Sequence, residues 1–231
     1  MDELKSMKVS KYNTLMRDVD IFYYSFDNDR VLDKHVRNLF CHILSKQEIN
    51  LANQYKTSIL IKKAIARRAL TKIILANYLS NISPKNIKLL KTQYGKPYLE
   101  NMEVHFSISH CDTMFLIGVS KKFELGIDIE DIKNKDYSDI AKYVLSDKEY
   151  SLYEKEKLEN KENLFLSFWT RKEAFFKANG IGLPDNLNML DTSYFLSKEI
   201  ISFSSLVISS FLPKIFATFL LYPPVKYPLF I

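Results

Sequence analysis

Cysteine is scarce in this chain of 231 residues, which contains only Cys41 and Cys111. The two form no CxxC pair, so neither a thiolate zinc site nor a disulfide framework is indicated. The sequence also lacks an apolar run of about 18 residues, the length needed to span a bilayer, and its start does not resemble a signal peptide. These absences predict a cytoplasmic protein with no membrane partner.

Apolar residues make up 47% of the chain, enough at this length for one large domain or two small ones. The net charge is +6, with a pI near 9.0. A positive balance favours an anionic partner, which could be a nucleotide, a nucleic acid, an acidic protein or a membrane surface. Charge alone does not choose among these classes.

One helix-start motif occurs twice. Ser45-Lys-Gln-Glu48 and Ser146-Asp-Lys-Glu149 both have the capping-box form, in which the serine and the glutamate satisfy each other's backbone amides. Each is followed, after a polar helical stretch, by a longer helix, expected at Ile59–Leu79 and at Leu164–Asn179. Capping boxes are common, so the repeat could be accidental, but it suggests two related α/β halves.

We therefore predict an α/β (α+β) fold with an N-terminal half at residues 1–122 and a C-terminal half at residues 123–231. Strands are expected at Val19–Phe26, Val104–His110 and Met114–Ser120, and a further helix at Val31–Leu44. The tail, residues 200–231, is apolar with poor alternation. Two interpretations stay open for it: buried strands that close the second half, or a divergent or frame-shifted terminus.

The alternation of apolar and acidic residues in Gly126-Ile-Asp-Ile-Glu130 predicts a strand. Successive side chains of a strand point to opposite faces, so Asp128 and Glu130 share one face while the isoleucines enter a core. Two acids on one face repel each other unless a cation lies between them. A solvated strand face is the plainer alternative.

We predict a helix that ends at Gly180 and contains Trp169-Thr-Arg-Lys-Glu-Ala-Phe-Phe-Lys177. Trp169, Glu173 and Lys177 are four residues apart and lie on one helix face, where Glu173 and Lys177 could also be an ordinary helix pair. Carboxylates without thiolates favour Mg²⁺ or Mn²⁺ over zinc. Mg²⁺ in turn indicates a substrate that carries phosphate.

Two further features could bind an anion. His110 follows Ser109 at the end of an expected strand, where an imidazole could bind phosphate, although a lone histidine is more often structural. A basic helix carries Lys62, Lys63, Arg67, Arg68 and Lys72. It is either a solvated helix face or a cationic wall for a polyanion, and the absence of interleaved aromatic residues counts against single-stranded nucleic acid.

Taken in order, these segments resemble the 4'-phosphopantetheinyl transferases, specifically the larger monomeric type that activates nonribosomal peptide and polyketide synthases. The matching segments are Tyr94-Gly-Lys-Pro97, Phe106-Ser-Ile-Ser-His110, Gly126–Glu130, Phe168–Lys177 and Gly180-Ile-Gly-Leu183. The likeness covers the chain from about Ser45 to Leu183. It implies a monomeric pseudo-dimer of two α/β halves with the active site in the cleft between them.

The resemblance also implies an activity: transfer of the phosphopantetheine arm of coenzyme A to a serine of an apo carrier protein, with release of 3',5'-ADP. Asp128, Glu130 and Glu173 would hold Mg²⁺ or Mn²⁺. Glu173 would also be the general base, Lys177 would neutralise the leaving pyrophosphate charge, and Lys172 would support Lys177.

The substrate-binding residues implied by the same resemblance are those of the phosphate and adenine ends of the coenzyme. Ser109 and His110 match positions that face the phosphates, while Gly95, Lys96 and Pro97 match the loop that lines the adenine. The family usually holds the 3'-phosphate from the start of the long first-half helix, where this chain has Lys56-Thr-Ser58. Lys56 or Thr57 could substitute, but the register is open.

The expected partner is a carrier protein with an acidic docking surface, toward which a chain of charge +6 is steered. No nucleic-acid partner is expected. Two alternatives remain at this stage. One is a metal-dependent nuclease, since acidic strand residues with Glu and Lys can also cleave phosphodiesters. The other is a non-catalytic module that binds coenzyme A or the carrier.

Overall fold

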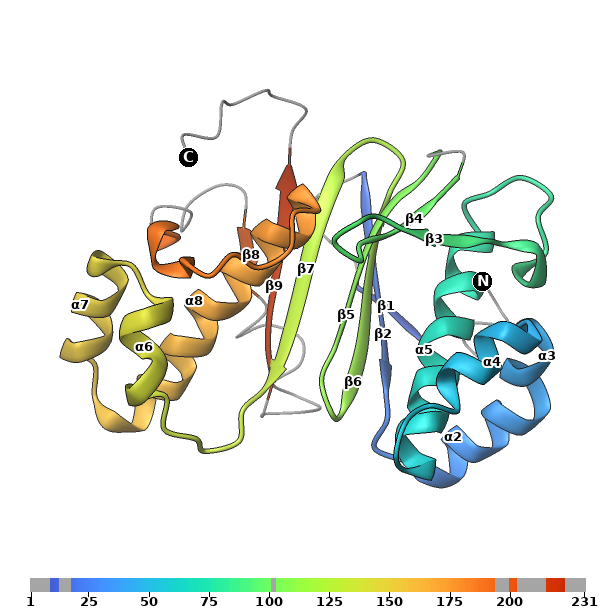
Figure 1. Ribbon diagram of the computed structural model, residues 1–231, viewed down its shortest axis with the longest axis horizontal. Coiled ribbons are helices and arrows are strands. Elements are labelled where there is room, and N and C mark those ends of the chain that lie inside the picture. Colours follow the sequence, from blue (N-terminus) through green and yellow to red (C-terminus); the bar gives the residue numbers. More distant parts are fainter. Residues whose placement is uncertain (1–8, 13–17, 101–102, 194–199, 203–214, 223–231) are drawn as a thin grey trace.

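The computed structural model describes residues 9–12, 18–100, 103–193, 200–202 and 215–222. It combines helices and sheets in the α+β manner predicted from the sequence, with strands at the centre and helices toward both sides (Figure 1). Within the described residues, no helix has the length and the apolar character required to cross a membrane.

The first half is built on a four-stranded antiparallel sheet in the order β1-β2-β6-β5. The strands are β1 (Ser10–Tyr12), β2 (Val19–Ser25), β5 (His105–His110) and β6 (Met114–Ser120). The register of β5 and β6 runs from the pair His105 and Ser120 to the pair His110 and Phe115, so a tight turn follows His110. The three strands predicted in this half are confirmed.

Helices cover one side of this sheet (Figure 1). They are α2 (Asp29–His35), the π-helical segment η1 (Val36–Phe40), α3 (Cys41–Ile43), α4 (Lys46–Ala52) and α5 (Ser58–Ala76). The helix expected at Val31–Leu44 is thus present but is interrupted by a π-helical turn. On α5, Ile65, Ala69 and Ile73 recur at helical spacing and are buried in the core with strand residues such as Phe106 and Ile117.

A short segment joins α5 to β5. It contains the 3₁₀ helix η2 (Pro84–Asn86) and a two-stranded hairpin of β3 (Leu89–Lys91) and β4 (Pro97–Leu99). The hairpin loop turns at Gly95, whose φ of 84° lies in the left-handed region that glycine adopts without strain.

The second half contains a three-stranded antiparallel sheet in the order β7-β9-β8, with α8 packed against it. Its elements are β7 (Glu124–Asp131), α6 (Ser138–Val144), α7 (Asp147–Lys155), α8 (Leu158–Asn179), the 3₁₀ helix η3 (Leu187–Met189), β8 (Ile200–Ser202) and β9 (Ile215–Tyr222). The long helix begins six residues before the predicted Leu164 and ends as expected, with Gly180 in the left-handed conformation.

In the described part of the tail, β8 and β9 are strands of the second-half sheet, which supports the interpretation that the tail contains strands closing this half. β9 pairs with β7 along its whole length, from Glu124 opposite Tyr222 to Asp131 opposite Ile215. The helix α8 lies against β9.

Both capping boxes form as predicted. Ser45 and Glu48 begin α4, and Ser146 and Glu149 begin α7, each with both reciprocal hydrogen bonds. A lysine from the long helix of the same half reaches each glutamate: Lys72 reaches Glu48 and Lys172 reaches Glu149. Each half therefore has the same arrangement, a capping-box glutamate held by a lysine of the long helix, which we call the anchor. The two halves also share the order of these helices.

Side chains join the two sheets where β5 lies beside β7 (Figure 1). The hydroxyl of Ser107 accepts a hydrogen bond from the Ile127 backbone N–H at 3.2 Å, and the hydroxyl of Ser109 donates to Asp128 at 2.7 Å. At the end of β7, Asp131 accepts hydrogen bonds from the turn that follows His110. These contacts fix the acidic strand against the end of β5.

Candidate functional site

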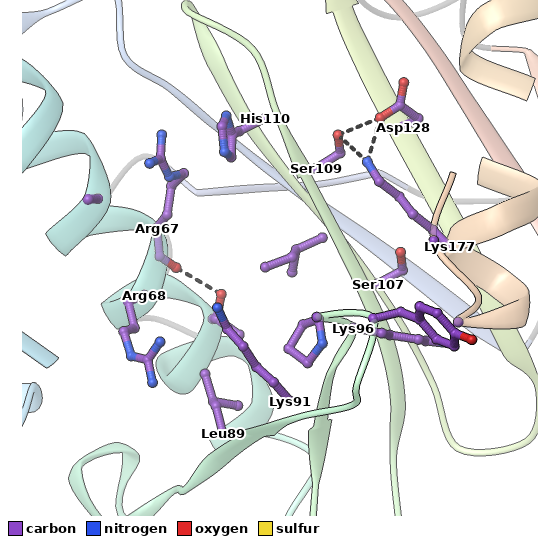
Figure 2. Close-up of a pocket in the computed structure, with 18 of the residues that line it drawn as sticks. Arg67, Arg68, Leu89, Lys91, Lys96, Ser107, Ser109, His110, Asp128 and Lys177 are labelled. Carbon is purple, nitrogen blue, oxygen red and sulfur yellow. Dashed lines mark hydrogen bonds and ion pairs between the residues drawn. The ribbon is translucent and has the colours of Figure 1, made fainter. Parts of the chain in front are cut away.

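A cavity of about 710 Å³ is lined by residues of both halves. The first half contributes residues of α4, α5, the β3–β4 hairpin and β5, and the second half contributes β7, α8 and the segment after α8. Figure 2 shows Arg67 and Arg68 on the α5 side of this space and Ser109, Asp128 and Lys177 on the other side. The cavity therefore lies where the two halves meet.

Gly126 determines how closely α8 approaches the acidic strand. A Cβ atom at this position would overlap the carbonyl oxygen of Ala174 and lie 2.6 Å from the backbone nitrogen of Ala178. Backbone atoms cannot retreat as a flexible side chain can, so only glycine allows this approach. The close packing brings Glu173 and Lys177, on the same helix, beside the acids of β7.

Asp128 is the centre of a buried polar network. Its Oδ1 accepts hydrogen bonds from Lys177 Nζ at 2.6 Å and from Ser109 Oγ at 2.7 Å, and Lys177 Nζ also donates to Ser109 Oγ at 3.0 Å (Figure 2). Lys177 Nζ lies 4.0 Å from Glu173 Oε2. The structure thus brings together Ser109, Asp128, Glu173 and Lys177, as the sequence predicts.

Glu130 joins this group at its edge, where Trp169 donates its indole N–H to Glu130 Oε1 at 3.2 Å. Burial, followed by the charge of Asp128, raises the pKa of Glu130 above its ordinary value. Burial and then Asp128 also raise the pKa of Glu173, to about 7, although Lys177 opposes the shift. Both pKa shifts therefore come first from burial and second from repulsion by Asp128, which the Lys177 ammonium only partly offsets.

The donor set of this cluster fits a hard divalent cation. Among the residues that the structure describes, no group of three His, Cys, Asp or Glu side chains is arranged to hold a metal ion. The Lys177 ammonium contacts Oδ1 of Asp128. Yet Asp128 Oδ2 is buried and has no hydrogen-bond partner among the described residues. An unsatisfied carboxylate oxygen beside two acids of raised pKa is suited to Mg²⁺ or Mn²⁺.

The opposite wall of the cavity is basic. Arg67 and Arg68 reach it from α5, Lys91 from β3 and His110 from the end of β5 (Figure 2). Burial and the positive charges of Arg67 and Lys177 lower the pKa of His110 to about 4. His110 is therefore a neutral hydrogen-bonding group at neutral pH, and the permanent positive charge comes from the arginines and the lysine.

Lys96 lies on the cavity, as do Gly95 and Pro97, but its ammonium points to the second half. Lys96 Nζ donates to Glu124 Oε2 and to the carbonyl oxygen of Ala178, both at 2.8 Å. The sequence predicts a substrate contact for Lys96. The structure gives its side chain a different contact, a bridge between the hairpin loop and the end of α8.

Lys172 is outside the cavity, contrary to the expectation that it supports Lys177. Its side chain is fully buried, and its ammonium contacts Glu149 Oε2 at 2.7 Å and the carbonyl oxygens of Leu187 and Leu190. Positions 172 and 177 are five residues apart, which places them about 140° apart around an α-helix. Lys172 therefore holds the second half together and does not reach the carboxylate cluster.

Some cavity residues have no clear signal in the sequence. Glu48 is expected only as a capping residue, yet it also lines the cavity, and Lys91 belongs to no motif. Thr57, a candidate phosphate ligand, instead caps α5, where its hydroxyl accepts a hydrogen bond from Leu60. Arg67 and Arg68, two turns or more further along α5, are the residues that reach the cavity.

Comparison with known proteins gives consistent matches. A family model described as the 4'-phosphopantetheinyl transferase superfamily matches residues 124–212. The protein named 4'-phosphopantetheinyl transferase gsp, from Aneurinibacillus migulanus, is 28% identical over 177 residues, which cover 74% of this chain and 69% of that protein.

Two further relatives carry the same family name. The protein 4'-phosphopantetheinyl transferase HetI from Nostoc sp. is 30% identical over 145 residues, 61% of each chain. The protein 4'-phosphopantetheinyl transferase Sfp from Bacillus subtilis is 28% identical over 166 residues, 69% of this chain and 70% of that protein. The alignments thus span 61% to 70% of the lengths of these three relatives.

Proposed function

We propose that the chain is a 4'-phosphopantetheinyl transferase, which transfers the phosphopantetheine group of coenzyme A to a carrier protein, as its similarity to proteins of that name suggests. The acceptor is a serine hydroxyl, the carrier changes from its apo to its holo form, and 3',5'-ADP is released. The observation that supports this most directly is a carboxylate cluster with Lys177 facing a basic wall across one cavity.

The basic wall suits the polyphosphate part of the substrate. Arg67, Arg68 and Lys91 carry permanent charge, and His110 is neutral at pH 7, so it can hydrogen-bond to a phosphate oxygen. Gly95 and Pro97, on the hairpin loop, line the same cavity and suit the flat adenine ring. The reactive phosphate would then lie toward β7 and α8.

The divalent cation would be held by Asp128, Glu130 and Glu173. Mg²⁺, or Mn²⁺ in its place, supplies charge neutralisation for the pyrophosphate when bound. Lys177, whose ammonium contacts Asp128 Oδ1, would also neutralise charge on the bound substrate. Ser109, which already contacts both groups, remains to hydrogen-bond to either.

Glu173 is the base in this proposal. Its carboxylate accepts the proton of the carrier serine while the serine oxygen forms a bond to the β-phosphorus of coenzyme A. The bond from that phosphorus to the bridging oxygen breaks, and the electron pair leaves with 3',5'-ADP. Lys177 stabilises the charge that develops on this leaving group. A buried carboxylate with a pKa near 7 is a stronger base than an exposed one.

The finer features of the fold and partner belong to the same proposal. The two halves are a pseudo-dimer within one monomer, and the cavity between them is the active site. The carrier presents an acidic surface to a chain of charge +6, so association weakens as salt rises. The cytoplasmic location stays a prediction from the two cysteines.

The decisive experiment is a transfer assay. Purified protein is incubated with Mg²⁺, coenzyme A and apo carrier proteins of the fatty-acid, polyketide and nonribosomal-peptide types. Mass spectrometry should find the mass of one phosphopantetheine added to the carrier serine, and none when Mg²⁺ is removed with a chelator. A folded sample that binds coenzyme A but modifies no carrier would reduce the protein to a binding module, and cleavage of DNA would point to a nuclease.

A further inference from the structure

The two capping-box glutamates have different surroundings although their anchors match. In the second half, the side chains of Glu149 and Lys172 are both fully buried. Thr192 completes that site by donating its backbone N–H at 2.7 Å and its hydroxyl at 2.6 Å to Glu149 Oε1. The second-half pair is therefore inaccessible to solvent, and both carboxylate oxygens of Glu149 accept hydrogen bonds from neighbouring protein groups.

In the first half, the corresponding pair of Glu48 and Lys72 lies beside the cavity. Glu48 accepts hydrogen bonds from Lys72 Nζ at 3.0 and 3.2 Å, and it also lines the cavity. A second cation, Arg68, donates its Nε–H to Glu48 Oε1 at 2.8 Å. Arg68 precedes Lys72 by one helical turn, and the corresponding position before Lys172 is Phe168, which is buried. The arginine is thus an addition that only the first half has.

The way in which Arg68 is held leaves its binding groups available. Among the hydrogen bonds of the described residues, the guanidinium uses only Nε, so the four Nη hydrogens carry no such bond. The side chain is 29% exposed and borders the cavity, on the same wall as Arg67 and Lys91 (Figure 2). Glu48 carries one negative charge against the two positive charges of Arg68 and Lys72, so this cluster keeps a net positive charge.

We infer that Glu48 is a positioning residue, which holds Arg68 by its Nε–H so that the outer N–H groups of the guanidinium bind a phosphate of the substrate. The inference rests on the proposed function, in which Arg68 belongs to the basic wall, and adds to it the residue that orients Arg68 and the N–H groups through which Arg68 binds. Two N–H groups of a guanidinium can donate hydrogen bonds to two oxygens of one phosphate. Because Glu48 already fixes the Arg68 side chain, little further rotational freedom is lost when phosphate binds.

Because Glu149 has the same anchor without an arginine and away from the cavity, it provides a matched control. If Glu48 serves only the fold, Glu48→Gln and Glu149→Gln should lower thermal stability and leave ligand affinity unchanged. If Glu48 acts through Arg68, only Glu48→Gln should change affinity, and the change should depend on Arg68.

The test measures the affinity of coenzyme A by calorimetry for the wild type, Arg68→Gln, Glu48→Gln and the double variant. Loss of a charge-assisted phosphate contact predicts about tenfold weaker binding for Arg68→Gln. Glu48→Gln should weaken binding about threefold in the wild type and have no effect in the Arg68→Gln background. Arg68→Lys keeps the charge but has neither an Nε–H for Glu48 nor the planar guanidinium fork, so it should weaken binding nearly as much as Arg68→Gln. This variant tests the inference even if Glu48→Gln does not fold.

Two results would overturn the inference: unchanged affinity in Arg68→Gln, or equal weakening by Glu48→Gln in both backgrounds. The same variants are titrated with inorganic pyrophosphate, an anion that carries no adenosine or pantetheine. If the wild type does not bind coenzyme A at all, the proposed function fails. The pyrophosphate series then still decides whether Arg68, held by Glu48, binds phosphate.

Discussion

The two long helices, α5 and α8, are anchored alike but present opposite chemistry to the cavity. Each places a buried lysine, Lys72 or Lys172, on the glutamate of a capping box. From the cavity-facing side, α5 presents arginines, whereas α8 presents Glu173 and Lys177. The anchors hold the two helices in place. In the proposed function, the cavity-facing residues of α5 bind the substrate and those of α8 take part in catalysis.

The strongest perturbation of this arrangement is Gly126→Ala. The new methyl group has to displace the backbone of α8 at Ala174, so we expect the free energy of unfolding to fall by more than about 4 kcal/mol. Urea denaturation monitored by the fluorescence of Trp169 measures the loss. As a control, Gly95→Ala strains only a loop residue with no atoms within 4 Å of its added Cβ. If Gly126→Ala is as stable as the wild type, close packing does not position α8.

Glu173→Gln should affect catalysis with little change in the fold. If Glu173 takes the serine proton, kcat for carrier modification falls about 10³-fold, because an amide cannot accept that proton. The affinity for coenzyme A without metal should change less than threefold, and removal of one of the repelling acids should leave thermal stability equal or higher. A variant that retains a tenth of the wild-type kcat would assign the base to another residue.

Arg67→Gln tests the other helix. Loss of one cation from the basic wall should raise KM for coenzyme A about tenfold and leave kcat within a factor of two. Opposite kinetic signatures for Arg67→Gln and Glu173→Gln would support the division between binding and catalysis. A drop in kcat without a rise in KM for Arg67→Gln would contradict it.

The smallest effect concerns stability and pH in the first-half anchor. Burial would raise the pKa of Glu48, but hydrogen bonds from Ser45 and Arg68 and the contact with Lys72 outweigh it and lower the pKa to about 2. Because the folded pKa is below the unfolded value of 4.5, this stabilisation is complete above pH 4.5 and is lost as the pH falls toward 2. After allowance for solvent screening, it is about 1–2 kcal/mol.

Glu48→Gln should remove this pH-dependent part. Chemical denaturation at several pH values between 5 and 2 should give a shallower fall in the free energy of unfolding for the variant than for the wild type. An identical slope in both proteins would mean that other carboxyl groups cause the acid sensitivity of the fold.

Much of the fold was predictable from residue patterns. Alternation placed β7 and helical spacing placed α5, while the capping boxes were formed at both predicted serines. Strand and helix periodicities also predicted that Asp128 shares a face with Glu130 and that Glu173 shares a face with Lys177. That these two faces meet in one cluster was implied only by the resemblance to a known family. β9 was not predicted as a definite strand, because residues 200–231 are apolar and show no regular alternation of apolar and polar residues.

The remaining differences concern where long side chains end. Lys96 and Lys172 belong to motifs, but a lysine extends several bonds from its backbone, and its ammonium goes to whichever carboxylate or carbonyl oxygen is near in three dimensions. The sequence predicts only a capping role for Glu48, because the capping box is complete without Arg68. The contact between Glu48 and Arg68 joins residues that are 20 positions apart. Such contacts follow from the packing of α4 on α5, not from the local sequence.

The pairing of β7 with β9 also has a consequence for the order in which the protein is made. Asp128 and Glu130 leave the ribosome well before Ile215–Tyr222, yet these later residues form the ladder on one side of their strand. Until β9 arrives, that edge of β7 exposes unpaired backbone groups that can pair with other chains. The acidic strand of the site is therefore completed only late in synthesis, and the nascent chain must keep an open edge until then.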